Sequence, residues 1–210
     1  MRLILIRHAA SQHSQQGIIA DIHGCTGLTA IGVQQAQTLA KRLRQTRELD
    51  HCAALLTSPV LRARQTAELL KPVLAVADLI EDGNLCELLV GVADGMSNKA
   101  YRAQYGEFAG PLAPNQAFAA GGESWAEFMQ RVQTTLDQLA KTYANQTIVA
   151  VSHAGFIVGS MLKLFDIPRP GTGTWLDPSN TGLTEWQCVQ NTWRLIRYND
   201  EFHLKNQHVF

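Results

Sequence analysis

A short apolar run near the amino terminus restricts the fold more than any other feature of the sequence. Residues 3–6, Leu-Ile-Leu-Ile, follow one another without polar alternation, and the run ends abruptly at Arg7 and His8. Such a run suits a central strand covered on both faces, although four residues alone are also compatible with a buried helical piece. A buried strand with an arginine and a histidine at its carboxyl end favours an α/β protein, because open α/β sheets bind ligands at that edge.

A second apolar run, residues 147–151, repeats this arrangement and is followed by Ser152, His153 and small residues. Two parallel strands that end in this way would place His8 and His153 at the same edge of one sheet. The stretch 147–165 is apolar enough to raise the question of a membrane span. Polar residues interrupt it, and its composition changes from β-branched to mixed, so a strand followed by a helix explains it better.

Periodicity and capping signals predict the remaining elements. Apolar residues at helical spacing indicate helices over 29–47, with Thr29 as N-cap, and from Ser124 to about residue 143. Ser58 and Pro59 indicate another helix start, with the serine as N-cap and the proline in the first helical position. Strands are expected at 53–57, around 74–76, at 182–189 and at 192–198, with a short helix and then a loop in 96–122 and a connecting loop at 168–173. We therefore predict a three-layer α/β/α fold with a mostly parallel central sheet.

Composition limits the partners and the location of the protein. At 210 residues, one domain spanning 1–210 is the simplest division. The 18 basic and 18 acidic residues cancel, which disfavours nucleic acid and anionic membranes as partners. The amino-terminal apolar run is too short for a signal peptide, so a cytoplasmic protein is expected. Four cysteines match no zinc or redox spacing and are expected to be reduced thiols: Cys25, Cys52, Cys86 and Cys188. The sequence carries no signature of oligomeric state, and a homodimer is compatible with it.

An anion site is expected where the two histidines meet. Arg62 falls in the first turn of the helix after Pro59, where free N–H groups and the helix dipole attract anions. The small residues that follow each strand are expected to expose further backbone N–H groups. Arg64 would face away and is expected at the surface. The long connection 9–28 borders the same edge, and its histidines, His13 and His23, are expected to be solvated.

The order of these pieces resembles the histidine phosphatase superfamily, also called phosphoglycerate-mutase-like. Six short motifs occur in the family's order over most of the chain. They are 5–8 (Leu-Ile-Arg-His), 28–36 (with Leu-Thr and Gln-Ala), 58–68 (with Ser58, Arg62-Ala63 and Thr66-Ala67), Glu87 with its following glycines, 121–132 (Gly-Gly-Glu-Ser with Arg131-Val132), and 151–155 (Val-Ser-His-Ala-Gly). Each motif alone is weak, but six in the right order are specific.

The resemblance implies a chemistry that the residues themselves support. Arg7 and Arg62 can make bidentate contacts to a phosphate, with His153 as a further phosphate-binding and electrostatic partner. A neutral imidazole nitrogen of His8 can attack phosphorus to give a phosphohistidine. Glu87 is the expected general acid, and later the base that activates water. No metal and no cofactor is expected, and the substrate is expected to be a small phosphorylated metabolite.

Substrate contacts are expected in the segments beside this centre. Ala10 stands where the family often has glutamate, and Ser14 where many members carry asparagine. Ser11 and Ser14 are therefore candidate substrate-binding residues, and residues 88–122 are expected to be an insertion that covers the substrate.

Three other functions remain open from the sequence. A phosphoglycerate mutase would need basic residues for the substrate carboxylate, and between Leu88 and Glu123 only Lys99 and Arg102 are basic. A catalytically idle phospho-ligand or protein-binding module would have no use for the acid Glu87. A metal hydrolase is disfavoured because no two histidines lie three or four residues apart.

Overall fold

The computed structural model describes residues 1–167 and 175–205, so the loop predicted at 168–173 lies outside the described residues. Its centre is a six-stranded sheet in the order β3-β2-β4-β1-β5-β6. The strands are β1 (Arg2–Arg7), β2 (Cys52–Thr57), β3 (Leu79–Glu81), β4 (Thr147–Ser152), β5 (Leu183–Val189) and β6 (Thr192–Asp200). Only β5 among them runs opposite to the other five strands, which confirms the prediction of a mostly parallel sheet.

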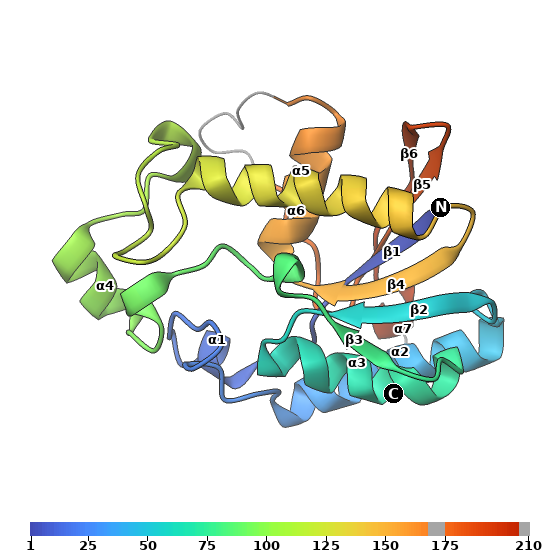
Figure 1. Cartoon of the computed structure of the whole chain (residues 1–210). Coiled ribbons are helices and arrows are strands. Elements are labelled where there is room, and N and C mark those ends of the chain that lie inside the picture. Colours follow the sequence, from blue (N-terminus) through green and yellow to red (C-terminus); the bar gives the residue numbers. More distant parts are fainter. Residues whose placement is uncertain (168–174, 206–210) are drawn as a thin grey trace.

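Helices cover both faces of the sheet (Figure 1). The described helices are α1 (Gln12–Gln15), α2 (Ala30–Thr46), α3 (Leu61–Leu74), α4 (Asn98–Tyr105), α5 (Trp125–Thr142), α6 (Ala154–Leu164) and α7 (Phe202–Lys205). The 3₁₀ turns lie at Gly83–Leu85, Gly91–Ala93 and Gly110–Leu112. Successive β1 side chains point to opposite faces. Leu3 and Leu5 pack into the core beneath α5 and α6, whereas Ile4 and Ile6 pack into the core beneath α2 and α3. The apolar run is thus a strand buried on both faces, in three layers as predicted.

The pairing of β1 with β4 sets the position of the two histidines. These strands are parallel neighbours at the centre of the sheet, and Arg7 lies opposite Ser152. His8 directly follows Arg7 and His153 directly follows Ser152, so both histidines lie side by side at the carboxyl edge of the sheet. In the backbone, the His8 N–H donates to the Ser152 carbonyl over 2.9 Å.

Several local predictions are confirmed. The Thr29 side chain caps α2 by accepting from Gly32, and Ser124 forms a reciprocal capping box with Glu127 at the start of α5. The stretch 147–165 is a strand followed by a helix. Among the described residues, none of the helices combines the length and hydrophobicity needed to cross a bilayer. The four cysteines are free thiols.

Two local predictions were wrong, both around α3. No strand occurs at 74–76, because Leu74 is buried in the last turn of α3 and the strand that pairs with β2 lies at 79–81. The helix also begins later than predicted, at Leu61 rather than at Pro59. Ser58 is therefore not its N-cap, and its hydroxyl is used elsewhere.

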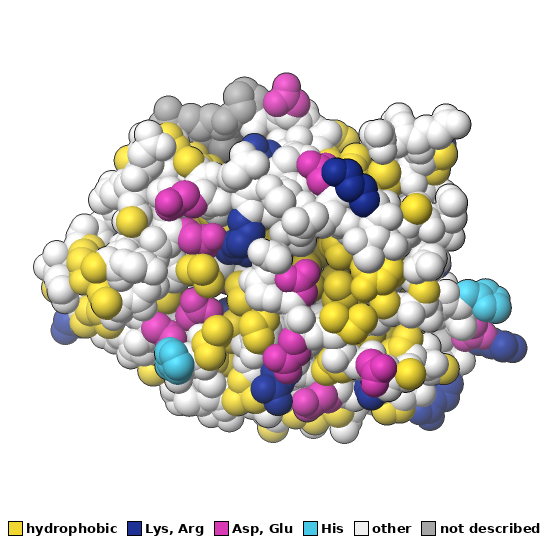
Figure 2. Space-filling model, in the orientation of Figure 1, with side chains coloured by type: hydrophobic (Ala, Val, Ile, Leu, Met, Phe, Trp, Pro, Cys, Tyr) yellow, Lys and Arg dark blue, Asp and Glu magenta, His cyan; other side chains and the backbone are white. Residues whose placement is uncertain are grey.

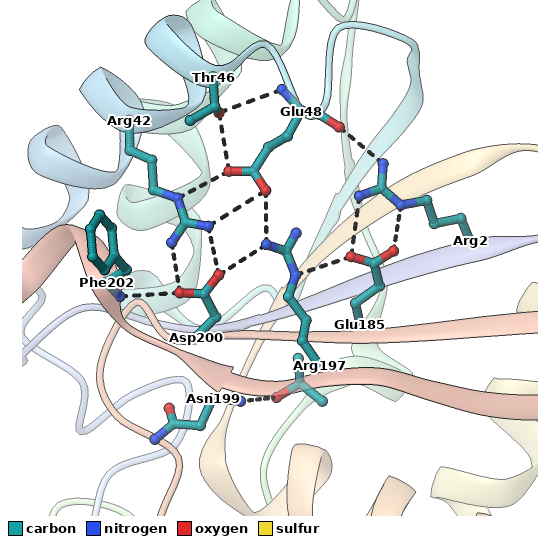
Figure 3. A network of polar contacts seen from close by, with 10 residues as sticks. Arg2, Arg42, Thr46, Glu48, Glu185, Arg197, Asn199, Asp200 and Phe202 are labelled. Carbon is teal, nitrogen blue, oxygen red and sulfur yellow. Dashed lines mark hydrogen bonds and ion pairs between the residues drawn. The ribbon is translucent and has the colours of Figure 1, made fainter.

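An ion-pair network on the α2 face ties the β5–β6 hairpin to β1 and α2 (Figure 3). Arg42 makes a bidentate contact to Asp200, with distances of 2.9 and 2.6 Å, and Arg2 makes one to Glu185, with distances of 2.6 and 3.1 Å. Three basic and three acidic residues take part: Arg2, Arg42, Arg197, Glu48, Glu185 and Asp200. The hydrogen bonds from Arg42 hold the pKa of Asp200 far below its ordinary value.

We expect Asp200→Asn to lower the free energy of unfolding by about 1–3 kcal/mol at pH 7, since the network is partly buried and Arg42 loses a charged partner. Because the folded-state pKa of Asp200 is depressed, its contribution is fully present above the unfolded pKa of about 4 and is lost as pH falls further. Urea unfolding at pH 7 and pH 3 measures this, and the difference between the proteins should shrink at pH 3. Glu107→Gln, in the exposed pair with Arg102, is the control and should change little.

Candidate active site

Three side chains from three elements meet at the carboxyl edge of the sheet. His8 follows β1, His153 is the N-cap residue of α6 after β4, and Arg62 lies in the first turn of α3. The two imidazole rings have centroids 5.2 Å apart and lie edge to face. The structure thus brings together three of the predicted site residues, from positions more than fifty residues apart in the chain.

The guanidinium group of Arg62 binds both rings at once. Its Nε donates to His8 Nε2 and its Nη2 to His153 Nδ1, each over 3.1 Å, while Nη1 donates to the carbonyl of Ala20 over 3.0 Å. Arg62 is 3% exposed, so this is a buried charge and not a surface arginine. All of these partners are neutral acceptors, and none of them compensates the positive charge.

These contacts fix the tautomer of each ring. His8 Nδ1 lies 2.8 Å from the Ala9 carbonyl and must carry the proton, which leaves a lone pair on Nε2 beside Arg62. His153 Nδ1 accepts from Arg62, so its Nε2 carries the proton and donates to Ser58 Oγ over 2.9 Å. The nitrogen of His8 that faces the guanidinium is therefore the one able to act as a nucleophile.

Burial and charge keep both imidazoles neutral. Burial is the main cause that lowers the pKa of His8 and of His153 well below the ordinary value, and the charge of Arg62 is the second cause for both. A neutral ring is the form that can attack an electrophile.

Arg7 lies at the same edge and has a hydrogen-bond donor that the described residues leave unused. Its Nη1 donates to the carbonyl of Pro178 over 2.5 Å and to Asp177 over 3.3 Å. Its Nε is buried and has no partner among the described residues. A buried guanidinium N–H without an acceptor is costly, and an anion bound at this edge would satisfy it.

The expectation of free backbone N–H groups after β1 was wrong. The N–H of Ala9 donates to Thr66 Oγ1 over 3.0 Å, and that of Ala10 donates to Gln35 Oε1 over 2.9 Å. Side chains of α3 and α2 therefore consume these donors. The small residues here serve close packing instead, as at Gly32, where an added Cβ would lie 2.0 Å from the Ala10 carbonyl oxygen.

Glu87 lies at the amino terminus of α6, which begins one residue after the second histidine. Its Oε2 accepts from the Gly155 N–H over 2.8 Å. This approach requires glycine, because an added Cβ at 155 would lie 1.9 Å from Glu87 Oε1. Arg131, paired with Glu123, donates to the carbonyls of Cys86 and Glu87 and so fixes the backbone that carries the carboxylate.

The two serines proposed for substrate binding lie around the short helix α1. Ser11 is buried and its hydroxyl lies 3.2 Å from that of Ser14, which is exposed and also contacts His13 Nε2 over 3.2 Å. His23 is exposed, as expected. His13 is not solvated, however: it is buried, so that prediction was wrong.

Sequence reasoning missed several residues that position the site. Ser58 binds the second histidine, Thr66 and Gln35 hold the turn after β1, and Arg131 holds the Glu87 segment. All four stood within recognised motifs, but a motif does not say which atom its residue contacts. Asn180, whose side chain donates to the His8 carbonyl over 2.8 Å, lies outside all of the motifs.

Comparison with known proteins agrees with this geometry. A model of the histidine phosphatase superfamily (branch 1) matches residues 3–201. The chain belongs to this superfamily. The matched range includes His8, Arg62 and His153, which meet at the carboxyl edge of the sheet.

Several named relatives of this superfamily member are phosphatases, and one, of Arabidopsis thaliana, is named phosphoglycerate mutase-like protein 4 and is 24% identical over 208 residues, which are 97% of this chain and 86% of the relative. Phosphoserine phosphatase 1 of Hydrogenobacter thermophilus is 29% identical over 160 residues, which are 73% of this chain and 71% of the relative. Adenosylcobalamin/alpha-ribazole phosphatase of Escherichia coli is 28% identical over 211 residues, covering 96% of this chain and 92% of the relative. The crystal structure of an Entamoeba histolytica phosphoserine phosphatase in complex with 3-phosphoglyceric acid has a TM-score of 0.77 and 26% identity, covering 97% and 98% of the two chains. These similarities support a phosphatase of the histidine phosphatase superfamily.

We expect Arg62→Gln to raise the pKa of both His8 and His153, because the mutation removes a positive charge that disfavours the imidazolium form. Nuclear magnetic resonance titration of the imidazole signals measures this. Arg64→Gln, two residues along α3 and at the surface in an ion pair with Glu81, is the matched control and should leave both values unchanged. Equal titration curves for the wild type and Arg62→Gln would contradict the assigned contacts.

Proposed function

We propose that this protein is a metal-independent phosphomonoesterase that acts on a small phosphorylated metabolite through a phosphohistidine on His8 Nε2. The observation that carries the proposal is the buried charge of Arg62, which forms no ion pair with a carboxylate among the described residues and donates to the unprotonated Nε2 of the neutral His8 ring. A phosphate monoester carries close to two negative charges and suits such a site. Arg7 supplies a second guanidinium at the same edge. No cofactor enters the proposed reaction.

In the proposed reaction, His8 Nε2 attacks phosphorus, and the bond between phosphorus and the alcohol oxygen breaks. Protonated Glu87 gives its proton to the leaving oxygen, and the alcohol departs. A water molecule then attacks the phosphohistidine, Glu87 takes its proton, and the bond from phosphorus to His8 breaks to release inorganic phosphate. Arg7, Arg62 and His153 stabilise the charge on the transferred phosphoryl group. In phosphoryl transfer, positioning and electrostatic stabilisation supply most of the catalysis.

Hydrolysis is favoured over phosphoglycerate mutase activity by the segment 88–122. The two basic side chains of this segment, Lys99 and Arg102, are both exposed, and Arg102 is paired with Glu107. Neither is placed to bind a substrate carboxylate inside the site. We propose that this segment covers a small substrate, and that nucleic acid and membranes are not partners. In support, acidic and basic side chains are scattered without a basic stripe over the face shown in Figure 2.

We expect the wild-type protein to hydrolyse small phosphomonoesters in the presence of EDTA. His8→Ala should lower kcat at least about a thousandfold and abolish the acid-labile phosphoenzyme, because the nucleophile is lost. Phosphate release over a substrate panel and rapid-quench labelling measure the two effects. His23→Ala, an exposed histidine of the neighbouring connection, is the control.

Other outcomes would replace the proposal. A wild type that binds phosphate tightly and hydrolyses nothing would indicate a binding module. Efficient interconversion of phosphoglycerates, with little phosphate released, would indicate a mutase. A strict requirement for added metal would contradict the proposed chemistry itself.

Glu87→Gln should slow the hydrolysis of phosphomonoesters with poor leaving groups about a hundredfold or more. It should slow the hydrolysis of nitrophenyl phosphate far less, because a good leaving group needs little protonation. Gly155→Ala should have the same selective effect, since the added methyl group displaces the Glu87 carboxylate. Gly83→Ala, where an added Cβ meets no atom within 4 Å, is the control. Kinetics with alkyl and aryl phosphates test this, and an equal loss on both substrate types would argue against Glu87 as the proton donor.

A further inference from the structure

His13, on the short helix α1, is a further buried imidazole beside His8 and His153, and the proposed reaction has no role for it. It is 9% exposed. Its Nε2 belongs to a chain of contacts in which Ser11 Oγ, Ser14 Oγ and His13 Nε2 follow one another at 3.2 Å. One side of the ring is thus held in place by the connection on which it lies.

The other ring nitrogen of His13 has no partner. Nδ1 is buried and makes no hydrogen bond among the described residues. Leaving a buried polar atom unsatisfied costs about 1–3 kcal/mol, so such an atom in a native protein calls for an explanation, and a hydrogen bond to a ligand is one. The Ser11 hydroxyl can donate to Ser14 Oγ, and the Ser14 hydroxyl can in turn donate to His13 Nε2. In that arrangement Nε2 is the unprotonated nitrogen of the ring, and Nδ1 carries the proton and is an N–H donor.

His13 interacts electrostatically with Arg62, His8 and His153, and it is itself neutral. Burial first, and then the charge of Arg62, lower the pKa of His13 to about 4, against a smaller opposing effect of Asp94. His13 in turn contributes to lowering the pKa of His8 and of His153. At neutral pH the ring therefore offers a hydrogen bond and not an ion pair.

The surroundings of His13 indicate which part of a ligand would reach Nδ1. Its carbonyl accepts from Ile18, at the start of a short ladder in which residues 17–19 pair with 95–98 of the covering segment. His13 thus lies where the connection and the cover meet, on the side of Arg62. With a phosphoryl group on Arg62, the alcohol portion of the substrate is the part that extends toward this junction.

We propose that His13 is a specificity-determining residue whose Nδ1 donates a hydrogen bond to the alcohol portion of the substrate. The substrate class is a phosphomonoester that carries a hydroxyl or carboxylate oxygen near the phosphorylated carbon. This inference rests on the proposed function for the placement of the phosphoryl group. It assigns His13 no part in bond breaking.

Two substitutions separate this role from a structural one. Asparagine places an N–H close to the position of Nδ1, whereas glutamine places a polar group close to Nε2 and keeps only the contact to Ser14. We expect His13→Gln to lower kcat/KM for O-phosphoserine and glycerol 3-phosphate about tenfold, the usual loss for one neutral hydrogen bond, and to leave phenyl phosphate within about twofold. His13→Asn should retain most of the preference. His23→Gln is the control on the same connection.

The same comparison is made by calorimetric binding of O-phosphoserine and phenyl phosphate in the His8→Ala background, which needs no turnover. Weaker binding of O-phosphoserine alone in His13→Gln, rescued in His13→Asn, supports the inference even if wild type hydrolyses poorly. Equal losses for both ligands, better retention in the glutamine variant than in the asparagine variant, or no loss at all would overturn it. Absence of hydrolysis in wild type, with binding intact, would instead count against the proposed function.

Discussion

One buried guanidinium holds the site together. Arg62 donates to an imidazole from each of the two central strands and to a carbonyl of the connection after β1, so three separate parts of the chain converge on it. Burying an uncompensated charge costs several kcal/mol, which the rest of the fold must offset. A bound dianion would offset this cost, because the protein contacts of Arg62 are all neutral acceptors.

The ion-pair network of the same protein shows the opposite use of arginine. There, three guanidinium groups face three carboxylates, and the charges balance within the fold. At the site, Arg7 and Arg62 have between them only the exposed carboxylate of Asp177 as an acidic contact among the described residues. The difference between the structural arginines of the network and the proposed anion-binding arginines therefore lies in the partners that surround them.

Much of the fold and the core of the site could be predicted from the sequence. The double-sided burial of residues 3–6 and 147–151 required central strands, and their parallel pairing then required that His8 and His153 meet. The start of α3 could not be predicted in the same way. Ser58 has the residue type of an N-cap, but its hydroxyl binds the ring of His153, a contact between residues 95 positions apart that no local signal reveals.

The long-range contacts of short polar side chains escaped prediction for the same reason. His13 lies in a stretch rich in polar residues, and polarity alone indicates exposure. It is nevertheless buried, in a connection whose residues 17–19 pair with the distant residues 95–98. Likewise, the N–H groups after β1 looked free in the sequence, but Gln35 and Thr66 reach them from two helices. Local patterns predict elements well, whereas the satisfaction of individual donors depends on tertiary neighbours.

Segment 88–122 is tied by backbone pairing to the connection that contacts Arg62. Residues 17–19 pair with 95–98 through backbone hydrogen bonds, and the next residue along the connection, Ala20, offers its carbonyl to Arg62. Backbone pairing is insensitive to side-chain identity, so segment 88–122 can vary in sequence while its register against residues 17–19 is kept. A change that shifts this register would, however, move the carbonyl that orients Arg62 and, with it, the angle at which the guanidinium meets His8. In this arrangement, the segment proposed to cover the substrate is tied through backbone hydrogen bonds to the connection whose Ala20 carbonyl accepts from Arg62.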